Sequence, residues 1–234
     1  MKYSHLLILL LIIAVAIPVK AQETRLFDTN ELGQVVLGDV MRTFQSREVK
    51  GTPYLSNEWV QGHIIINENA NTESIYLRFN SYQNRVEFAR DQNAYAVDSK
   101  KIDGFVLYAS DGRIIFRNGF TSDKHDIEPS TLLRVIQDGN TKFLCHHKTT
   151  LKEDLPTYGS ATKKDEFVSN QNFYIVDSDG TFHEIKKLKA KHVLGILDDK
   201  KKEIKEFVRT NNLDYSKESD IARIVAFYNK QQAS

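Results

Sequence analysis

The chain has 234 residues and carries 32 lysines and arginines against 31 aspartates and glutamates, so its formal charge is +1. This near-neutral balance gives no electrostatic case for nucleic-acid binding, which needs a concentrated basic surface, and we expect no nucleic-acid partner. A single cysteine excludes an internal disulfide, so packing of the apolar residues, 41% of the chain, has to hold the fold together.

The amino terminus has the pattern of a secretory signal peptide. Lys2 supplies a positive charge, residues 6–16 are an unbroken apolar run, and Val19-Lys20-Ala21 places small residues before Gln22. The apolar run is shorter than the roughly 18 residues of a spanning helix, which favours a signal peptide over a membrane anchor. We therefore predict a signal peptide over residues 1–21, cleavage near Ala21/Gln22, and export to the periplasm or out of the cell. No transmembrane segment is expected after cleavage.

Alternating apolar and polar residues predict antiparallel strands in the first half of the mature chain. In SIYLRFN, residues 74–80, the apolar side chains at 75, 77 and 79 share one face. A strand with an apolar face over 60–66 precedes it. A third strand, which carries Val86 and Phe88, follows after a hairpin loop at 81–84. Three such strands in succession predict a meander.

Three Asp-Gly pairs predict tight hairpin turns, because glycine adopts the positive φ that these turns require. The polar segment 152–164, with Pro156 and Gly159, is the expected long loop. The turns are unequally spaced, which excludes a solenoid or propeller repeat. The predicted hairpins are Asp111-Gly112 between 105–108 and 114–117, Asp138-Gly139 between 132–137 and 142–147, and Asp179-Gly180 between 173–176 and 181–185.

After Lys187 the apolar period changes from two to 3.6, which predicts amphipathic helices. We therefore expect an α+β fold. Its β-rich domain, residues 22–187, is built of antiparallel hairpins or a meander and forms a sandwich or a partly open barrel. Two to three helices of a tail over 188–234 pack on that domain. The predicted apolar stripes are Ala190, Val193, Leu194 and Leu197, then Ile204, Phe207 and Val208, then Ile221, Ile224, Val225 and Tyr228.

Three stretches carry a resemblance: KGTPYLSNEWVQGHIIIN at 50–67, IYLRFNSYQNRVEF at 75–88, and KKKEIKEFVRTNNLDYSKESDIARIVAFYNK at 200–230. Together they resemble a group of uncharacterised exported proteins of Bacteroidetes-type bacteria. The resemblance covers most of the mature chain and implies export of a single intact protein. It implies no activity, ligand or catalytic residue.

The stretch FLCHHKTT, residues 143–150, contains the only cysteine, Cys145, followed by His146 and His147. In a strand, neighbouring side chains point to opposite faces, so the two histidines cannot reach one metal ion. Cys145 and His147 share a face but lie some 6–7 Å apart, beyond hydrogen-bond reach of a nucleophile and its base. We expect a buried strand with no catalytic residue, no metal and no cofactor.

Aromatic residues near the first strands are the candidates for a binding surface, because tyrosine and tryptophan combine rigid apolar area with a polar group. Tyr54 and Trp59 flank the start of the first strand, and packing of Trp59 at the edge of the core is the alternative. Tyr76 and Tyr82 complete the candidate site. Tyr95 and Tyr108 are expected with them on the outer face of the early sheet.

Three hypotheses for function stay open. The first is an exported, non-enzymatic envelope or secreted protein that binds a protein, glycan or lipid partner, or a small ligand. The second is a periplasmic carrier or chaperone for an apolar ligand such as a lipid, enclosed by a curved sheet and the tail helices. The third is a hydrolase whose acid–base residues leave no short motif, since the sequence contains no nucleophile elbow, phosphate loop or dinucleotide fingerprint.

Overall fold

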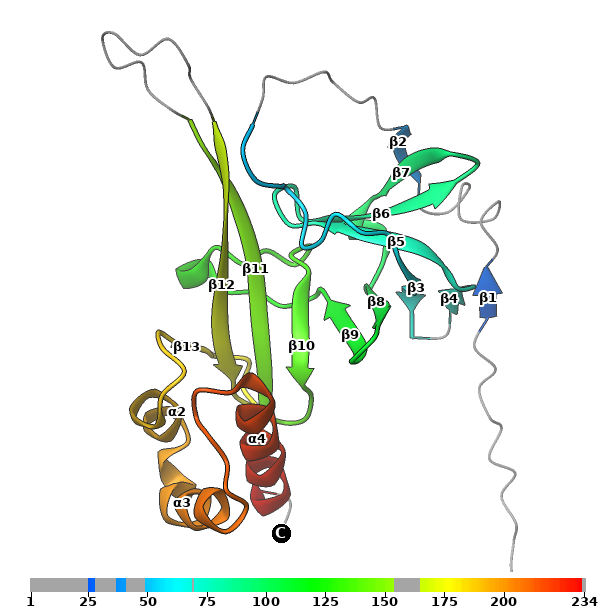
Figure 1. Ribbon diagram of the computed structural model, residues 1–234. Coiled ribbons are helices and arrows are strands. Elements are labelled where there is room, and N and C mark those ends of the chain that lie inside the picture. Colours follow the sequence, from blue (N-terminus) through cyan, green and yellow to red (C-terminus); the bar gives the residue numbers. More distant parts are fainter. Residues whose placement is uncertain (1–24, 28–36, 41–48, 69, 154–164, 233–234) are drawn as a thin grey trace, which may run out of the picture.

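The computed structural model describes residues 25–27, 37–40, 49–68, 70–153 and 165–232, and its α+β class confirms the prediction (Figure 1). An open antiparallel sheet forms most of the protein, and three carboxyl-terminal helices pack on it. The predicted signal peptide and nearly all of the predicted loop at 152–164 lie outside the described residues.

The predicted strands and helices are present, most of them with small shifts of their ends. The strand predicted over 142–147 continues to 152, the strand predicted over 173–176 begins at 166, and the strands at 25–27, 37–40, 70–72 and 93–97 were not predicted. Short 3₁₀ segments lie at η1 (Ser99–Lys101), η2 (Asp123–His125) and η3 (Asp198–Lys200). The helices are α2 (Ala190–Ile196), α3 (Lys201–Thr210) and α4 (Glu218–Gln232). The strands are β1 (Arg25–Phe27), β2 (Leu37–Val40), β3 (Val60–Asn67), β4 (Ala70–Thr72), β5 (Ile75–Asn80), β6 (Arg85–Arg90), β7 (Asn93–Val97), β8 (Gly104–Ala109), β9 (Gly112–Arg117), β10 (Leu133–Gln137), β11 (Lys142–Lys152), β12 (Glu166–Val176) and β13 (Phe182–Ile185).

Eleven strands form one path in the order β13-β12-β11-β10-β9-β8-β3-β5-β6-β7-β2. Neighbours along the path are antiparallel, and most are also neighbours in the chain, as a meander requires. The exceptions are β3 with β5, which skips β4, β7 with β2, and β8, which pairs with β3 instead of β7. The chain returns to β3 through η1 and buries Ile102 on the way. Off the path, β4 pairs with β3 and β1.

All three predicted Asp-Gly turns are confirmed. They join β8 to β9, β10 to β11 and β12 to β13, and their glycines have positive φ. None of these turns joins β11 to β12, which form the longest antiparallel pair, a ribbon in which all 11 residues of each strand are paired. In Figure 1 this ribbon stands beside the strands β3 to β7, and the helices lie at its lower end.

The sheet has two faces, which we define by side chains that paired strands place on the same side. The inner face carries Leu77, Phe105, Phe116 and Phe143, and the outer face carries Arg78, Val106, Leu133 and Leu144. We call β3 and β5–β9 the N-terminal half and β10–β13 the C-terminal half. The distinction matters because apolar material covers different faces of the two halves.

On the inner face, the N-terminal half curls around a core of phenylalanines. Phe105 stacks on Phe116 with ring centroids 4.6 Å apart, and Phe79 lies 4.8 Å from Phe116. In the C-terminal half the same face is covered by the helices, whose buried residues pack against Phe143 and Ile175. Those helix residues are Val193, Leu194, Leu197, Ile204, Ile221, Ile224 and Val225.

The outer face of the C-terminal half is covered as well. The segment 118–131, which contains η2, packs Ile127 and Phe120 against this side of the strands. The buried strand residues beneath it are Leu133, Leu144, Tyr174, Val176 and Phe182. The C-terminal half is therefore buried on both faces where the helices and this segment pack on it.

Candidate functional site

Exposed side chains form a row on the outer face of the N-terminal half. Tyr76 on β5 is 52% exposed and Tyr108 on β8 is 41% exposed, and both belong to the few large aromatic or aliphatic side chains that are exposed among the described residues. Gln61 on β3 and Arg113 on β9 are exposed too. We call these four residues the aromatic row.

Strand register brings the row together. Gln61 is paired with Tyr76, and Tyr108 is paired with Arg113. Gly62 is paired with Leu107, so the next position sets Gln61 opposite Tyr108. Directly opposed residues share a face, and neighbouring strands lie about 4.8 Å apart, so the two tyrosines stand about 10 Å apart with the glutamine amide between them.

His63 holds Tyr108 in place. Its Nδ1 is 2.7 Å from the Tyr108 hydroxyl, and the two rings are tilted with centroids 5.7 Å apart. Burial, together with the nearby Arg117 and Arg113, lowers the pKa of His63. The imidazole is therefore neutral at pH 7, and its hydrogen bond with the Tyr108 hydroxyl joins two uncharged groups.

A second group, next to the aromatic row, contains Tyr54 and Trp59. The Arg78 guanidinium lies 3.7 Å from the centroid of the Tyr54 ring and 4.3 Å from that of Trp59. Its Nη2 donates to the Tyr54 hydroxyl at 3.0 Å and to Glu87 Oε2 at 2.9 Å. Asn80 Nδ2 donates to the other Glu87 oxygen at 3.3 Å.

The Arg78 group is a closed network around a buried carboxylate. Glu87 has no exposed side-chain surface, and Arg78 retains 17%. Burial and the nearby Glu87 carboxylate raise the pKa of Tyr54, so its phenol keeps the proton. Tyr54 and Trp59 are thus engaged by the protein itself, and their cation–π contacts hold Arg78 beside the aromatic row.

Of the four candidates from the sequence, three lie on the outer face. Tyr54, Trp59 and Tyr76 share that face, whereas Tyr82 lies in the β5–β6 turn with its ring edge-on to Phe167 at 5.2 Å. The expectation for Tyr95 was wrong. The β6–β7 register sets Tyr95 opposite Phe88, so it stacks on that ring at 5.3 Å on the inner face.

Gln61, His63 and Arg113 were missed as members of the site. The signal for Gln61 and His63 was present, because they are the polar residues that alternate with the apolar face of 60–66. Their proximity to Tyr108 and Arg113 depends on the return of β8 to β3, which no local pattern specifies.

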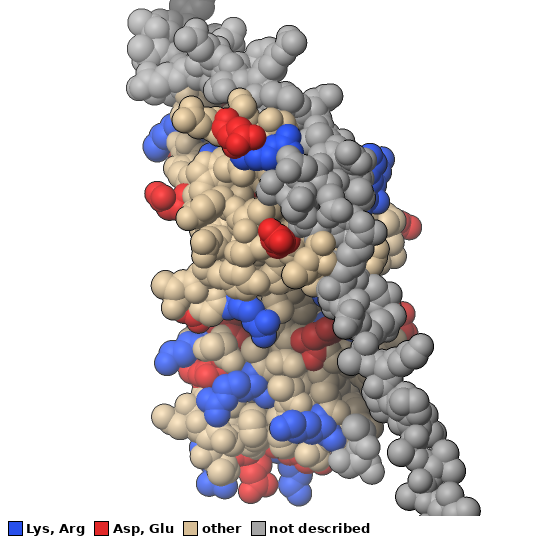
Figure 2. Space-filling model, turned by 90° about the vertical axis from the view of Figure 1, so that its right-hand side faces the viewer, with Lys and Arg blue, Asp and Glu red and all other residues tan. Residues whose placement is uncertain are grey.

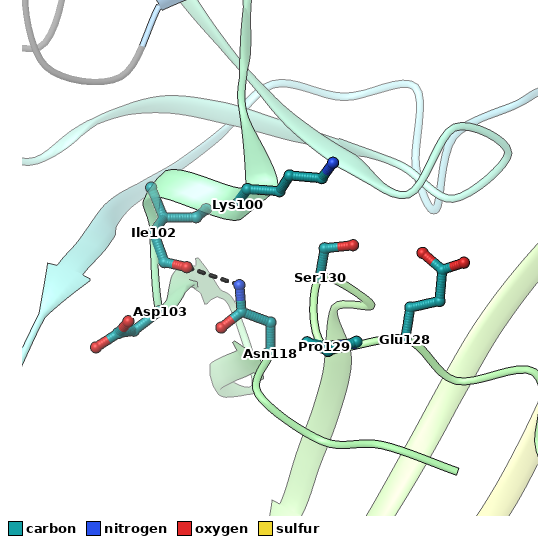
Figure 3. A pocket seen from close by; sticks show the side chains of 7 residues that line it. All are labelled: Lys100, Ile102, Asp103, Asn118, Glu128, Pro129 and Ser130. Atoms are coloured by element: carbon teal, nitrogen blue, oxygen red, sulfur yellow. Dashed lines mark hydrogen bonds between the residues drawn. The ribbon is translucent and has the colours of Figure 1, made fainter. Parts of the chain in front are cut away.

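A pocket of ≈370 Å³ lies where the β7–β8 return meets the segment after β9 (Figure 3). Asn118 anchors it, since its Nδ2 donates to the Ser99 and Ile102 carbonyl oxygens at 2.7 and 2.6 Å. Figure 3 shows the Asp103 and Glu128 carboxylates at opposite ends and pointing apart. The remaining lining residues are Lys100, Pro129 and Ser130.

This pocket is at the small end of the range for ligand sites, about 300–1,000 Å³, and most of its lining side chains are polar. A carrier for an acyl chain needs a largely apolar cavity, and glycoside cleavage needs two carboxylates that face one bond. The pocket supports neither activity.

FLCHHKTT lies in β11, as predicted. Cys145 is fully buried, and burial raises the pKa of its thiol to about 12, so it stays protonated. Burial lowers the pKa of both His146 and His147 to about 4. The His147 ring lies 6.0 Å from that of Phe116. A protonated thiol and buried neutral imidazoles are typical of packed interior.

Within the described ranges, no three histidine, cysteine, aspartate or glutamate side chains gather closely enough to hold a metal ion. The helices in those ranges lack the length and apolar character needed to cross a bilayer. Figure 2 shows one face of the molecule, where the coloured atoms mix both signs of charge and the charged residues concentrate in the lower part.

No protein-family model matches the chain, and no match is found among curated proteins or solved structures. The interpretation of the site therefore depends on its own geometry.

Proposed function

We propose that the protein is an exported, non-enzymatic binding protein that holds a neutral glycan chain on the aromatic row. The observation that carries this proposal is the register that aligns Tyr76, Gln61 and Tyr108 on three neighbouring strands with both rings exposed. Export is inferred from the signal-peptide pattern of residues 1–21.

The chemistry of the row suits a carbohydrate. A pyranose ring presents C–H groups on its faces, which pack on aromatic rings, and hydroxyls at its edge, which need donors and acceptors. Tyr76 and Tyr108 supply two such rings about 10 Å apart, the scale of a disaccharide. The Gln61 amide between them has both a donor and an acceptor for hydroxyls, and Arg113 adds donors at one end.

The row is also organised before a ligand arrives. Tyr108 is held by His63, and Tyr76 extends from a strand that is hydrogen-bonded on both sides. Tyrosine has few rotatable bonds, so a ligand that stacks on it costs little side-chain entropy. Arg113 is the single charge in the row, which favours a ligand without dense charge.

The test is binding of the mature chain, residues 22–234, to a panel of neutral β-linked and α-linked glycans by affinity electrophoresis and calorimetry. We expect the variant Tyr76→Ala with Tyr108→Ala to lose about 100-fold in affinity, since each ring contributes on the order of 1–2 kcal/mol of apolar contact. Gln61→Ala should weaken binding by about tenfold through one or two lost hydrogen bonds.

Tyr82→Ala is the matched control, because Tyr82 is 43% exposed but lies outside the row. It should bind like the unmodified protein. If no glycan of the panel binds, the ligand class is wrong. If a glycan binds with equal affinity to the double variant, the aromatic row is not its site.

A further inference from the structure

One edge of β12 is only partly covered. Along its other edge all 11 residues pair with β11. On the partly covered edge, β13 pairs with residues 173–176. Farther along the same edge, Lys50 forms a single parallel bridge with Glu166. Phe167 donates its N–H to the Lys50 carbonyl at 2.9 Å, and Lys50 donates to the Asp165 carbonyl at 2.8 Å. A gap of five residues, 168–172, lies between these two partners.

The gap presents a defined set of hydrogen-bonding groups. The main-chain N–H and C=O groups of a strand point to its two edges in alternation from one residue to the next. The Phe167 N–H points to the partly covered edge, so the N–H and C=O groups of Ser169 and Gln171 point to that edge as well. That gives two donors and two acceptors. Among the described residues these four groups have no main-chain partner, and the side chains of Ser169, Asn170 and Gln171 are exposed.

The gap lacks the features that keep other sheet edges from pairing. Its sequence, VSNQN, contains no lysine, no proline and no charge, and the strand is regular through it, without a bulge. An edge of this kind is a template for another strand.

We propose that the gap binds an extended segment of about five residues from a different protein, which joins the sheet between the Lys50 segment and β13. Only a peptide backbone repeats donors and acceptors at the spacing that Ser169 and Gln171 present. The gap is about 16 Å long at 3.3 Å per residue. A second copy of β12 is excluded by length, since its 11 residues would overlap β13 and the Lys50 segment.

This peptide site is separate from the glycan site. It uses the edge of the C-terminal half, whereas the glycan proposal uses the outer face of the N-terminal half. The failure of one proposal leaves the other standing, because the two have different measurements. Exchange of the amides of residues 169 and 171 tests the peptide site, and glycan affinity tests the aromatic row.

The experiment uses ¹⁵N-labelled protein, residues 22–234, and an acetylated, amidated pentapeptide Thr-Ile-Thr-Ile-Thr as probe. Without peptide, the amides of Ser169 and Gln171 should exchange with solvent much faster than those of Asn170 and Asn172, which bond to β11. At half-saturation with the probe, exchange at 169 and 171 should slow about twofold, because half of the sites are then protected. An analogue methylated at every backbone nitrogen should have no effect.

Ser169→Pro with Gln171→Pro removes the two donors that face the gap and spares the ladder to β11, because proline is tolerated where the N–H faces solvent. This variant should lose the response to the probe. Ser169→Ala with Gln171→Ala keeps both amides and should respond like the unmodified protein. Unchanged amide signals of Leu144 and His146 establish that both variants are folded.

Three results would overturn the proposal. The first is slow exchange at 169 and 171 before any peptide is added, which would mean that the edge is already covered. The second is an equal response to the fully methylated analogue, which would mean contact through side chains. The third is a change of these signals on dilution of the protein alone, which would mean that a second copy occupies the edge.

Discussion

The two halves of the sheet differ in how many of their faces are buried. In the C-terminal half, helices cover the inner face and the segment 118–131 covers the outer face. In the N-terminal half the inner face holds the phenylalanine core, while the outer face exposes Tyr76 and Tyr108. Large rings that a fold leaves open on one side are available to a ligand, and rings that it buries on both sides are not.

Tyrosines on the outer face illustrate the difference. Tyr108 on β8 and Tyr174 on β12 both belong to this face, but Tyr108 is 41% exposed and Tyr174 is 3% exposed. The burial of Tyr174 comes from Ile127 and Phe182, and it raises the pKa of the Tyr174 phenol to about 12. The same residue type therefore contributes to stability in one half and to the candidate site in the other.

The largest effect should follow deletion of residues 188–234, which breaks the C-terminal half. The helices bury Val193, Ile204 and Ile221 completely, and each such side chain is worth about 1.5–3 kcal/mol. Together with the rest of the cluster this exceeds a typical net stability of roughly 5–15 kcal/mol. The shortened chain should aggregate and melt far below the full chain.

Calorimetry of both chains, with fluorescence of Trp59, tests this prediction. Trp59 is the only tryptophan and reports on the N-terminal half. Equal melting temperatures would mean that the helices add nothing to the sheet. A separate unfolding transition of the N-terminal half in the shortened chain would show that the two halves unfold independently.

The next effect is acid sensitivity of the C-terminal half, where β11 buries His146 and His147. Burial lowers their pKa from 6.5 to about 4, which corresponds to at most about 3 kcal/mol each. Between these pH values the unfolded chain binds more protons, so the free energy of unfolding falls as the pH drops from 6.5 towards 4. Above pH 6.5 this contribution is fully present.

Denaturant unfolding as a function of pH, with the double variant His146→Gln and His147→Gln, isolates the two imidazoles. The variant should be less dependent on pH between 6.5 and 4 than the unmodified protein. Parallel pH profiles for the two proteins would mean that the imidazoles are accessible in the folded state.

Most of the fold could be predicted from the sequence because it is built from local hairpins. The alternation in 74–80 and the three Asp-Gly turns each specify a strand pair without reference to the rest of the chain. The helices could be predicted equally well, since the apolar period changes after Lys187. The return of β8 to β3 could not be predicted, because it joins residues far apart in sequence and no turn residue specifies it.

The candidate site could be predicted only in part for the same reason. Tyr54, Trp59 and Tyr76 were identified by residue type, but the row needs the register of β3 with β8. Tyr95 was assigned to the wrong face because a prediction by residue type ignores the register of the β6–β7 hairpin. Face assignment requires the pairing, since a shift of one residue exchanges the two faces.

A pair of substitutions measures the difference between the halves directly. Tyr174→Ala should cost about 3–5 kcal/mol, as for a large ring removed from a packed interior. Tyr108→Ala should cost within about 0.5 kcal/mol, typical of an exposed position. Urea denaturation of both variants provides the values. Equal costs would mean that the outer face of the N-terminal half is as tightly covered as that of the other half, which contradicts its role as an open site.

The smallest effect compares two hairpin turns, one in each half. Any other residue at position 112 or 139 would be strained to a similar degree, because φ is 136° at Gly112 and 148° at Gly139. A Cβ on Gly112 meets nothing within 4 Å, whereas a Cβ on Gly139 would lie 2.4 Å from Nδ2 of Asn229 on α4. Asn229 cannot move away freely, because its amide accepts from the Thr141 N–H and donates to the Thr141 carbonyl, both at 2.8 Å.

Both alanine variants carry the cost of the turn, so their difference isolates the contact between helix and turn. Gly139→Ala should be less stable than Gly112→Ala by about 1–2 kcal/mol, the net value of the two hydrogen bonds that Asn229 would lose. In the Asn229→Ala background, Gly139→Ala should cost no more than Gly112→Ala costs in the unmodified protein, because the side chain that blocks the new Cβ is then absent. Urea denaturation of the unmodified protein, Gly139→Ala, Asn229→Ala and the double variant completes the cycle, and Gly112→Ala is measured beside them. If Gly139→Ala and Gly112→Ala are equally stable, α4 does not hold this turn, and the helices stabilise the C-terminal half through their apolar contacts alone.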